Sequence, residues 1–469
     1  MSHEIRANYN QIWLLPPSLD DLLPADHPAR YIREFVDALD LEALDFRMRK
    51  GEEGRPNYAP DLLLKVWVYG YLERVRSSRR LEKACRHDVA LIWLTGMNYP
   101  DHNSLWRFWN DNRDAIKRVF RQTVRVAAKA GLIGMALHAL DGTKVTARAS
   151  TDKMWRRKVL QEKLRKLDKS LQEMEAEVER SEQQEAGQEC GLPEELANKQ
   201  ALRETVRAKL AELAKEDRAH MHPGERDARV MKNHEGTRLA YNSQAVVESK
   251  AGLIVAADVS NEENDAHQLV PMMEQVKEEL GEVAEETVTD AGYCSGEQLA
   301  GAEEAHFPVL VSLDGVKANR EAGGAYHSSH FIYDKEKDCY YCPRGEQLSY
   351  QKTRKAARSR VYRCHSYKAC PVRWECSRDK QGRSVERRPY CEARLSQEQK
   401  QKDEAKKKLL RQRKHTVEPV FAIIKNVLGF RRYTAGGLDK VRSQWWFVCA
   451  VVNLLRMYRF WKAGELEFA

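Results

Sequence analysis

The sequence lacks a long hydrophobic run. Its most apolar stretch, Trp445 to Leu455, is shorter than the roughly 20 residues that a membrane-spanning helix needs, and Arg456 and Arg459 follow it closely. The N-terminus, Met1-Ser2-His3-Glu4, also lacks the charged and then apolar pattern of a signal peptide. These absences predict a cytoplasmic protein with no membrane partner.

Cysteine is scarce outside one segment. The chain has ten cysteines, and six of them lie between Cys339 and Cys391. In a cytoplasmic protein such crowding points to metal before disulfides, and thiolates at this density suit a tetrahedral Zn²⁺ ion. The expected ligands are Cys342, Cys364, Cys370 and Cys376, with Cys339 of the C-x2-C pair as a competitor. Reduced thiols in a loop are the alternative.

Neither sign of charge dominates the chain as a whole. The formal net charge is only +9, but Lys and Arg are clumped in three places: Arg74 to Arg86, Lys406 to Lys414, and Arg431-Arg432. Clumped cations favour a polyanionic partner such as nucleic acid, although each run alone also fits an ordinary solvated face.

Residues 1–131 read as almost entirely helical. Asp26-His27-Pro28 is expected to begin one helix, with Asp26 as the N-cap and Pro28 in the first turn. Short helices with outward-facing basic residues fit a helix-turn-helix-like DNA reader. They fit a helical dimerisation domain equally well.

Residues 135–315 alternate between strand and helix patterns and predict a mixed α/β sheet. His138 to Ala147, Arg238 to Glu248 and Leu253 to Val259 are expected strands, and Asn264 or Asp265 is expected to cap the next helix. Charged residues with leucines at a and d positions interrupt this region at 153–217 and predict an antiparallel helical hairpin. A Cys-rich insertion follows at 316–395, and C-terminal helices at 396–469 are expected to complete the core.

Three carboxylates stand out by position. Asp141 and Asp290 lie near the ends of expected strands, where sites collect in open α/β sheets. Glu418 lies on a later helix whose apolar stripe includes Val417 and Val420. Three such groups can hold two divalent cations about 4 Å apart, and Mg²⁺ prefers oxygen ligands. Asp258, at another strand end, is a rival.

The order of the motifs resembles the DDE-type transposases of bacterial insertion sequences, the branch with a helical N-terminal domain and a ribonuclease-H-like core. Three core motifs carry most of the resemblance: Leu140-Asp141-Gly142-Thr143-Lys144, Thr289-Asp290-Ala291-Gly292-Tyr293 and Val417-Glu418-Pro419-Val420-Phe421. The resemblance implies that Asp141, Asp290 and Glu418 are the catalytic residues and that they bind two Mg²⁺ or Mn²⁺ ions.

The family's Tyr-Arg-Glu-Lys signature is only partly present. Lys425 matches its lysine, whereas Lys414 stands at the arginine position and Arg411 at the tyrosine position. Arg413 is a possible substitute for the arginine. The resemblance implies that these four cations contact DNA.

The resemblance also implies the reaction and its partners. Hydrolysis at the transposon ends would free a 3′-hydroxyl, which then attacks target DNA, so double-stranded DNA is the expected partner. A homo-oligomer, a dimer when two ends are brought together, is expected at the bacterial nucleoid. The alternatives are a ribonuclease-H-like DNA nuclease without strand transfer and a catalytically inactive DNA-binding regulator derived from a transposase.

Overall fold

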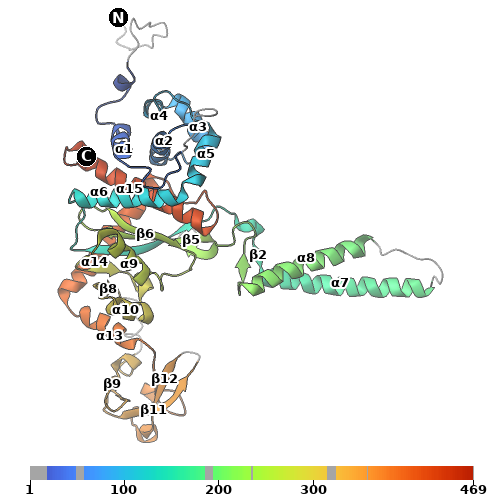
Figure 1. Ribbon diagram of the computed structural model, residues 1–469. Helices are drawn as coiled ribbons and strands as arrows, with labels where there is room; N and C mark the ends of the chain where they lie inside the picture. Colours follow the sequence, from blue (N-terminus) through green and yellow to red (C-terminus); the bar gives the residue numbers. More distant parts are fainter. Residues whose placement is uncertain are drawn as a thin grey trace, which may run out of the picture. The chain divides into compact units, whose positions relative to one another are not determined.

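The computed structural model describes residues 18–48, 57–184, 194–233, 236–313, 324–355 and 358–467 (Figure 1). The chain divides into two compact units. The first comprises Met1–Leu132, Ala422–Phe430 and Trp446–Ala469, and the second comprises Ile133–Phe421 and Arg431–Trp445. The C-terminal residues are therefore shared between the two units.

The first unit is built from helices. They are α1 (Pro28–Asp37), α2 (Pro60–Leu72), α3 (Ser78–His87), α4 (Val89–Leu94), α5 (His102–Asp111), α6 (Arg113–Lys129) and the outer part of α15 (Leu438–Lys462). Aromatic rings form part of its core: Trp109 lies 4.9 Å from Trp67 and 5.0 Å from Phe447 between ring centroids. Asn453 of α15 donates to the buried Thr123 hydroxyl of α6 at 3.1 Å. Residues from the two ends of the chain thus share one hydrophobic core.

The start of α1 differs from the sequence expectation by one residue. His27, rather than Asp26, is the N-cap, and its Nδ1 accepts the Ala29 backbone N–H at 3.1 Å. The side chain of Asp26 instead pairs with Lys462 at 2.5 Å. Pro28 occupies the first turn, where its missing N–H costs no helical hydrogen bond.

The second unit contains the main sheet. Its strands are β1 (His138–Thr146), β4 (Arg229–Asn233), β5 (Gly236–Glu248), β6 (Ile254–Ser260), β7 (Thr287–Thr289) and β8 (Val309–Val311). β5 pairs antiparallel with β1 and, through its other edge, with β4 and β6. β7 and β8 continue the sheet parallel to β1. This mixed sheet confirms the expected α/β class and is consistent with a ribonuclease-H-like core.

Helices pack against this sheet through a continuous apolar cluster. They include α9 (Leu269–Leu280), α10 (Gly296–Glu304) and α13 (Cys391–Lys400), which contribute Met273, Leu299 and Ala393 to the cluster. α14 (Glu404–Ala422) follows α13. The sequence suggested Asn264 or Asp265 as the cap of α9. The helix instead begins at Leu269, and Gln268 is its N-cap. Asp265 therefore has a different role.

Two long helices leave the main sheet as an arm. α7 (Arg157–Gln184) and α8 (Glu194–Lys215) lie side by side, and the short strands β2 (Trp155–Arg156) and β3 (His220–Met221) pair at their base (Figure 1). Arg203 of α8 pairs with Asp168 of α7 at 2.8 Å, which helps to hold the helices together. The turn expected near residues 185–193 lies outside the described residues.

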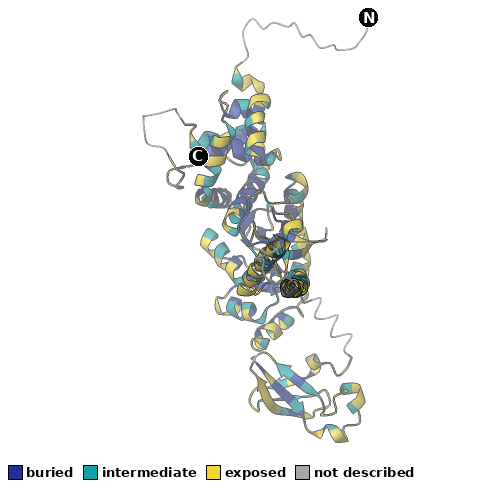
Figure 2. Ribbon diagram, turned by 90° about the vertical axis from the view of Figure 1, so that its right-hand side faces the viewer, coloured by how far each residue is buried: buried dark blue, intermediate teal, exposed yellow. Residues whose placement is uncertain are grey.

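The Cys-rich region forms a second, smaller sheet. Its five antiparallel strands run in the order β13-β12-β11-β10-β9, with bounds Ile332–Asp334 (β9), Cys339–Tyr341 (β10), Gln347–Arg354 (β11), Ser359–Cys364 (β12) and Ser384–Arg387 (β13). Its core is small and centres on Tyr362 and Leu348. Figure 2 shows many exposed and half-buried residues here, in contrast to the buried strands of the main sheet.

Candidate active site

The main sheet brings Asp141 and Asp290 side by side on neighbouring strands. Asp290 directly follows the end of β7, as expected, whereas Asp141 lies inside β1 and not near its end, because that strand continues to Thr146. β1 and β7 are parallel, and their register pairs Ala139 with Val288 and Leu140 with Thr289. The next residue on each strand is the aspartate. Because registered residues of parallel neighbours lie side by side, the strand pairing itself places the two aspartates next to each other.

The Asp141 carboxyl is largely buried, with 16% of its side chain exposed. Burial raises its pKa to about 6; the Arg413 guanidinium opposes this shift, and the nearby Asp290 charge adds to it. Arg413 Nη1 donates to Asp141 Oδ2 at 2.5 Å, and the Gly142 N–H donates to Oδ1 at 2.8 Å. The charged form of Asp141 is therefore stabilised mainly by the cation placed against it.

Asp290 is held by the turn that follows β7. Its carboxylate caps a short 3₁₀ turn, Ala291–Tyr293, and accepts the Gly292 N–H at 2.8 Å. This bond fixes the side chain through the backbone immediately after it. Tyr293, at the end of the turn, is fully buried, and its hydroxyl donates to Gln244.

Glu418 forms no hydrogen bond or ion pair with the described residues around the aspartate pair. It lies on α14, and its side chain is exposed. Arg413, five residues earlier on the same helix, is the residue that reaches Asp141. Pro419 follows Glu418 inside the helix, and a π-helical segment, Ile423–Val427, comes next. Proline and π-helical turns both distort helices, and the latter are frequent at functional sites.

The four cations predicted from the sequence fall into different environments. Arg413 contacts Asp141, as described, whereas Arg411 and Lys414 are exposed on α14. Lys425 lies in the π-helical segment and is half-buried. The signature spacing selects Lys414. The guanidinium that contacts Asp141 belongs instead to Arg413, one residue earlier.

Asp265 is a further carboxylate near these two aspartates, and no sequence motif pointed to it. Its Oδ1 accepts from Asn242 Nδ2 at 2.6 Å, Gln244 Nε2 at 2.7 Å and Lys144 Nζ at 3.4 Å. Burial lowers the pKa of Lys144, and the charges of Asp265, Asp290 and Asp141 oppose that shift. The same three carboxylates act on Tyr293, whose pKa is raised mainly by burial and then by these charges. Asp265 thus belongs to the same site.

Two glycines allow the three carboxylates to approach. A Cβ on Gly142 would lie 2.7 Å from Asp265 Oδ1 and 2.6 Å from Gln244 Nε2. A Cβ on Gly292 would lie 2.9 Å from Asp290 Oδ1 and 3.4 Å from Asp265 Oδ2. Side chains at either position would intrude on the carboxylates. The glycine that closely follows each motif aspartate was the sequence signal for this crowding.

The rival Asp258 has a different partner. It lies on β6, and its Oδ1 pairs with Arg442 Nε at 3.0 Å. The Arg442 side chain also donates to the Val259 backbone carbonyl at 3.0 Å. This pairing is structural, since it ties the N-terminal part of α15 to the edge strand.

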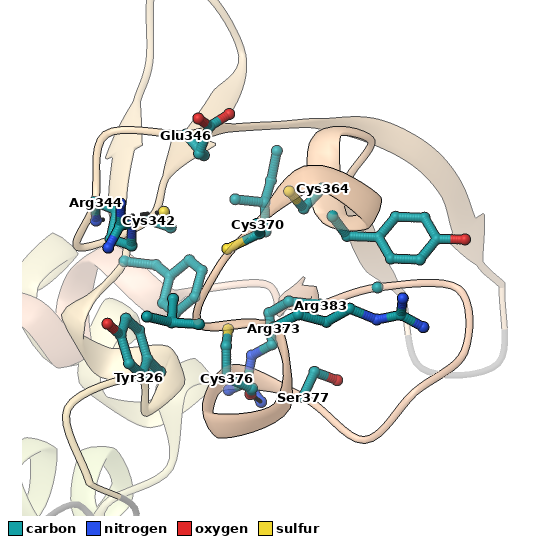
Figure 3. A pocket seen from close by; sticks show the side chains of 15 residues that line it. Tyr326, Cys342, Arg344, Glu346, Cys364, Cys370, Arg373, Cys376, Ser377 and Arg383 are labelled. Carbon is teal, nitrogen blue, oxygen red and sulfur yellow. Dashed lines mark hydrogen bonds between the residues drawn. The ribbon is translucent and has the colours of Figure 1, made fainter.

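The second sheet gathers the four predicted cysteines. Cys342, Cys364, Cys370 and Cys376 line one pocket together with Phe331 and Leu348 (Figure 3). Cys339 does not line it, although it was a competitor by spacing. Burial raises the pKa of the Cys376 thiol; Arg383 opposes the shift, and the three other cysteines add to it. Cysteine side chains from four separate positions of the chain therefore line the same pocket.

No metal-binding cluster is already formed in the part of the chain that the structure describes. There, no group of three or more His, Cys, Asp or Glu side chains is close enough to hold an ion. Within the same residues, no helix has the length and apolar character needed to cross a membrane.

Comparisons with protein families identify two segments. Residues 17–111 match the family described as "Transposase domain (DUF772)", and residues 341–458 match the "Transposase DDE domain". The second match begins in the small sheet and includes Glu418, whereas Asp141 and Asp290 precede it and lie outside both matched segments. No curated protein matches the sequence.

Proposed function

We propose that this chain is a transposase that cuts DNA at the ends of an insertion sequence and joins them to target DNA. The matches to a transposase domain at residues 17–111 and to a transposase DDE domain at residues 341–458 support the proposal. Cleavage and joining would both be phosphoryl transfers. The observation that carries the proposal is the β1–β7 register, which supports placing Asp141 beside Asp290. A site of this chemistry needs clustered carboxylates that can hold divalent cations.

In the proposal, Asp141 and Asp290 hold Mg²⁺ or Mn²⁺, and Glu418 is the third catalytic residue. When bound, two divalent cations would lower the pKa of the attacking water or hydroxyl and neutralise charge on the leaving oxygen. The donor set fits such ions, because carboxylate oxygens are their preferred ligands. The buried Asp141 carboxylate also already faces a cation, the Arg413 guanidinium. The role of Glu418 rests on its sequence motif, since no contact links its side chain to the two aspartates among the described residues.

Arg413 and Asp265 have supporting roles in the proposal. Arg413 provides a planar guanidinium that can turn from Asp141 to a DNA phosphate, for which its fork of donors is well shaped. Asp265 is a positioning residue: three donors fix its Oδ1, and its Oδ2 packs towards Gly292 and the Asp290 turn. Lys414, Arg411 and Lys425 are proposed to contact DNA further along α14 and its continuation.

The four pocket cysteines are proposed to bind a structural Zn²⁺. Tetrahedral zinc commonly takes four cysteine thiolates, and these four thiols already share one pocket. They do not yet form a closed ligand set, so binding would draw the segments together. Metal binding and folding are often coupled in small domains with little apolar core.

The remaining parts of the proposal concern organisation. Residues 1–131 are assigned to DNA binding or dimerisation, 135–315 and 396–469 to the catalytic core, and 316–395 to the zinc-binding insertion. Joining two transposon ends at one target requires both to be held together, which favours a homo-oligomer.

The test of this function uses full-length protein, a labelled duplex carrying the element's ends, and supercoiled plasmid as target, with Mg²⁺ or Mn²⁺. The expected products are cut ends and plasmid joined to the labelled 3′ strand. Cut ends without joined plasmid would support a nuclease without strand transfer. Binding with neither product would contradict the enzyme assignment and support a DNA-binding regulator.

A further inference from the structure

The excess positive charge of this protein is concentrated in the small sheet. The whole chain has 79 Lys and Arg against 70 Asp and Glu, a net charge of +9. Counted along the sequence, residues 332–388 contain 16 Lys and Arg against 7 Asp and Glu, which is also a net +9. The rest of the chain is therefore balanced. A strongly basic surface of this kind attracts a polyanion.

Within this sheet, β11 extends beyond its neighbour β10, whereas β13 follows β12 to Arg360. β10 pairs only with Gln347–Ser349 of β11, and β13 pairs with residues 360–363 of β12. Beyond Ser349, β11 therefore has β12 as its one partner among the described strands. Residues 350–355 are all exposed, so the side chains of this part of β11 are accessible.

Some arginines of the small sheet are already neutralised by acidic neighbours. Arg354 lies 3.4 Å from Glu386, and Arg360 lies 2.5 Å from Asp338. Three other cations of the hairpin, Lys352, Lys355 and Arg358, are exposed and form no ion pair with the described residues. These three carry the unbalanced charge of the hairpin's outer end.

A backbone hydrogen bond links two of these residues: the Arg358 N–H donates to the Lys355 carbonyl at 3.2 Å. Arg358 has a φ of 46°, a left-handed conformation in which glycine would be less strained. An arginine at this position places a long cation where the fold alone would favour glycine. At the base of the ribbon, the Arg360 guanidinium lies 4.7 Å over the exposed Tyr350 ring.

We infer that the outer end of the β11–β12 hairpin contacts the phosphate backbone of duplex DNA through Lys352, Lys355 and Arg358. Lysine and arginine contacts to phosphate contribute affinity without sequence preference. This inference rests on the proposed function, because it assigns a DNA contact to a chain proposed to act on DNA.

The test compares two triple variants of the full-length protein. The hairpin variant carries Lys352→Gln, Lys355→Gln and Arg358→Gln. The control carries Lys158→Gln, Lys163→Gln and Arg165→Gln, which remove the same charge from exposed positions on α7. Binding of a fluorescent, random-sequence duplex of about 40 base pairs is measured by anisotropy between about 50 and 200 mM salt, where phosphate contacts have their largest effect.

The hairpin variant should bind about tenfold or more weakly at the lowest salt. The slope of log affinity against log salt should fall by about 2 to 3, since each lost phosphate contact removes about 0.9. The control should keep the wild-type slope. Circular dichroism and the thermal midpoint of both variants would verify that they are folded.

Equal slopes for the hairpin variant and the control would overturn the inference. If the wild type still cut and joined DNA in that case, the proposed function would stand. If the wild type neither bound this duplex nor cut end-containing DNA, both proposals would fail. Equal weakening by the two variants would show a general charge effect and would also overturn the hairpin contact.

Discussion

The two sheets of the second unit differ in how they are stabilised. The main sheet and its helices share a cluster of fifteen buried apolar residues, including Leu140, Val246 and Met273. The small sheet has six such residues, and one of them is Cys364. A large core can hold buried charges such as Asp141 in place, whereas a small core needs additional cross-links. The sheet with the larger core holds the buried Asp141 carboxyl, and the sheet with the smaller core holds the four pocket cysteines and the exposed cations of β11.

The largest expected effect concerns the carboxylates of the main sheet. Asp141→Asn and Asp290→Asn should each reduce DNA cleavage by about a thousandfold or more, because several kcal/mol of charge stabilisation would be lost. DNA binding should persist. Asp258→Asn is the matched control. It weakens the pairing with Arg442, which lies outside the site, and should keep most of its cleavage activity. Gel assays with end-containing duplex measure all three variants.

The next prediction tests whether the small sheet depends on metal. Freshly purified protein should contain one zinc per chain, and the double variant Cys364→Ser with Cys376→Ser should contain none. Hydrogen exchange should then become much faster in β11 and β12 but not in β1 and β5, since structural zinc contributes directly to folding. Cys391→Ser, which alters a cysteine outside the pocket, should retain the metal. Unchanged exchange in zinc-free protein would rule out the proposed structural metal.

A third prediction follows from the raised pKa of Asp141. Its pKa rises from 3.8 to about 6 on folding, so the folded state binds this proton more tightly than the unfolded state. The resulting stabilisation is complete below pH 3.8 and is lost as the pH rises through about 6. The loss is up to ~3 kcal/mol, from about 1.4 kcal/mol per pKa unit.

Thermal melts in chelator between pH 4 and 7 would measure this effect. Because an amide does not titrate in this range, the variant Asp141→Asn should lose less stability between these pH values than the wild type does. Identical pH dependence in the two proteins would show that Asp141 is not perturbed by burial.

The smallest predicted effect concerns the close packing beside Asp141. Gly142→Ala should lower the free energy of unfolding by about 1 to 3 kcal/mol, because the new methyl group would overlap the Gln244 amide and the Asp265 carboxylate. Gly224→Ala is the control, since its nearest neighbour would lie 3.5 Å away, at ordinary contact distance. Urea unfolding measures both changes. Equal stabilities would mean that the carboxylates can move apart without cost.

Local patterns were sufficient to predict the strand that carries Asp141 and the general α/β class. The alternation around Asp141 is visible in the sequence, and the resemblance selected Asp290 from a short motif. Asp265 could not be found this way, because its position depends on contacts with Lys144 of β1 and with Asn242 and Gln244 of β5. Their convergence is a property of the sheet and not of any single segment.

The cation beside Asp141 and the strands of the small sheet could not be predicted from the sequence. Spacing from Glu418 selected Lys414, but the direction in which α14 faces the sheet brings Arg413 to Asp141. The small sheet has strands of three to eight residues, too short and polar for a clear alternating signal. The four cysteines were selected by local density, and the structure places them around one pocket. Zinc binding and the domain limits stay predictions.

The central claim is that Asp141 and Asp290 together hold the divalent cations used for DNA cleavage. Calorimetric titration of Mn²⁺ into metal-stripped, full-length protein with duplex DNA tests it most directly. The account predicts Mn²⁺ binding by the wild type and by Asp258→Asn, and at least about tenfold weaker binding by Asp141→Asn and by Asp290→Asn. Wild-type affinity in both of the latter variants would contradict the account.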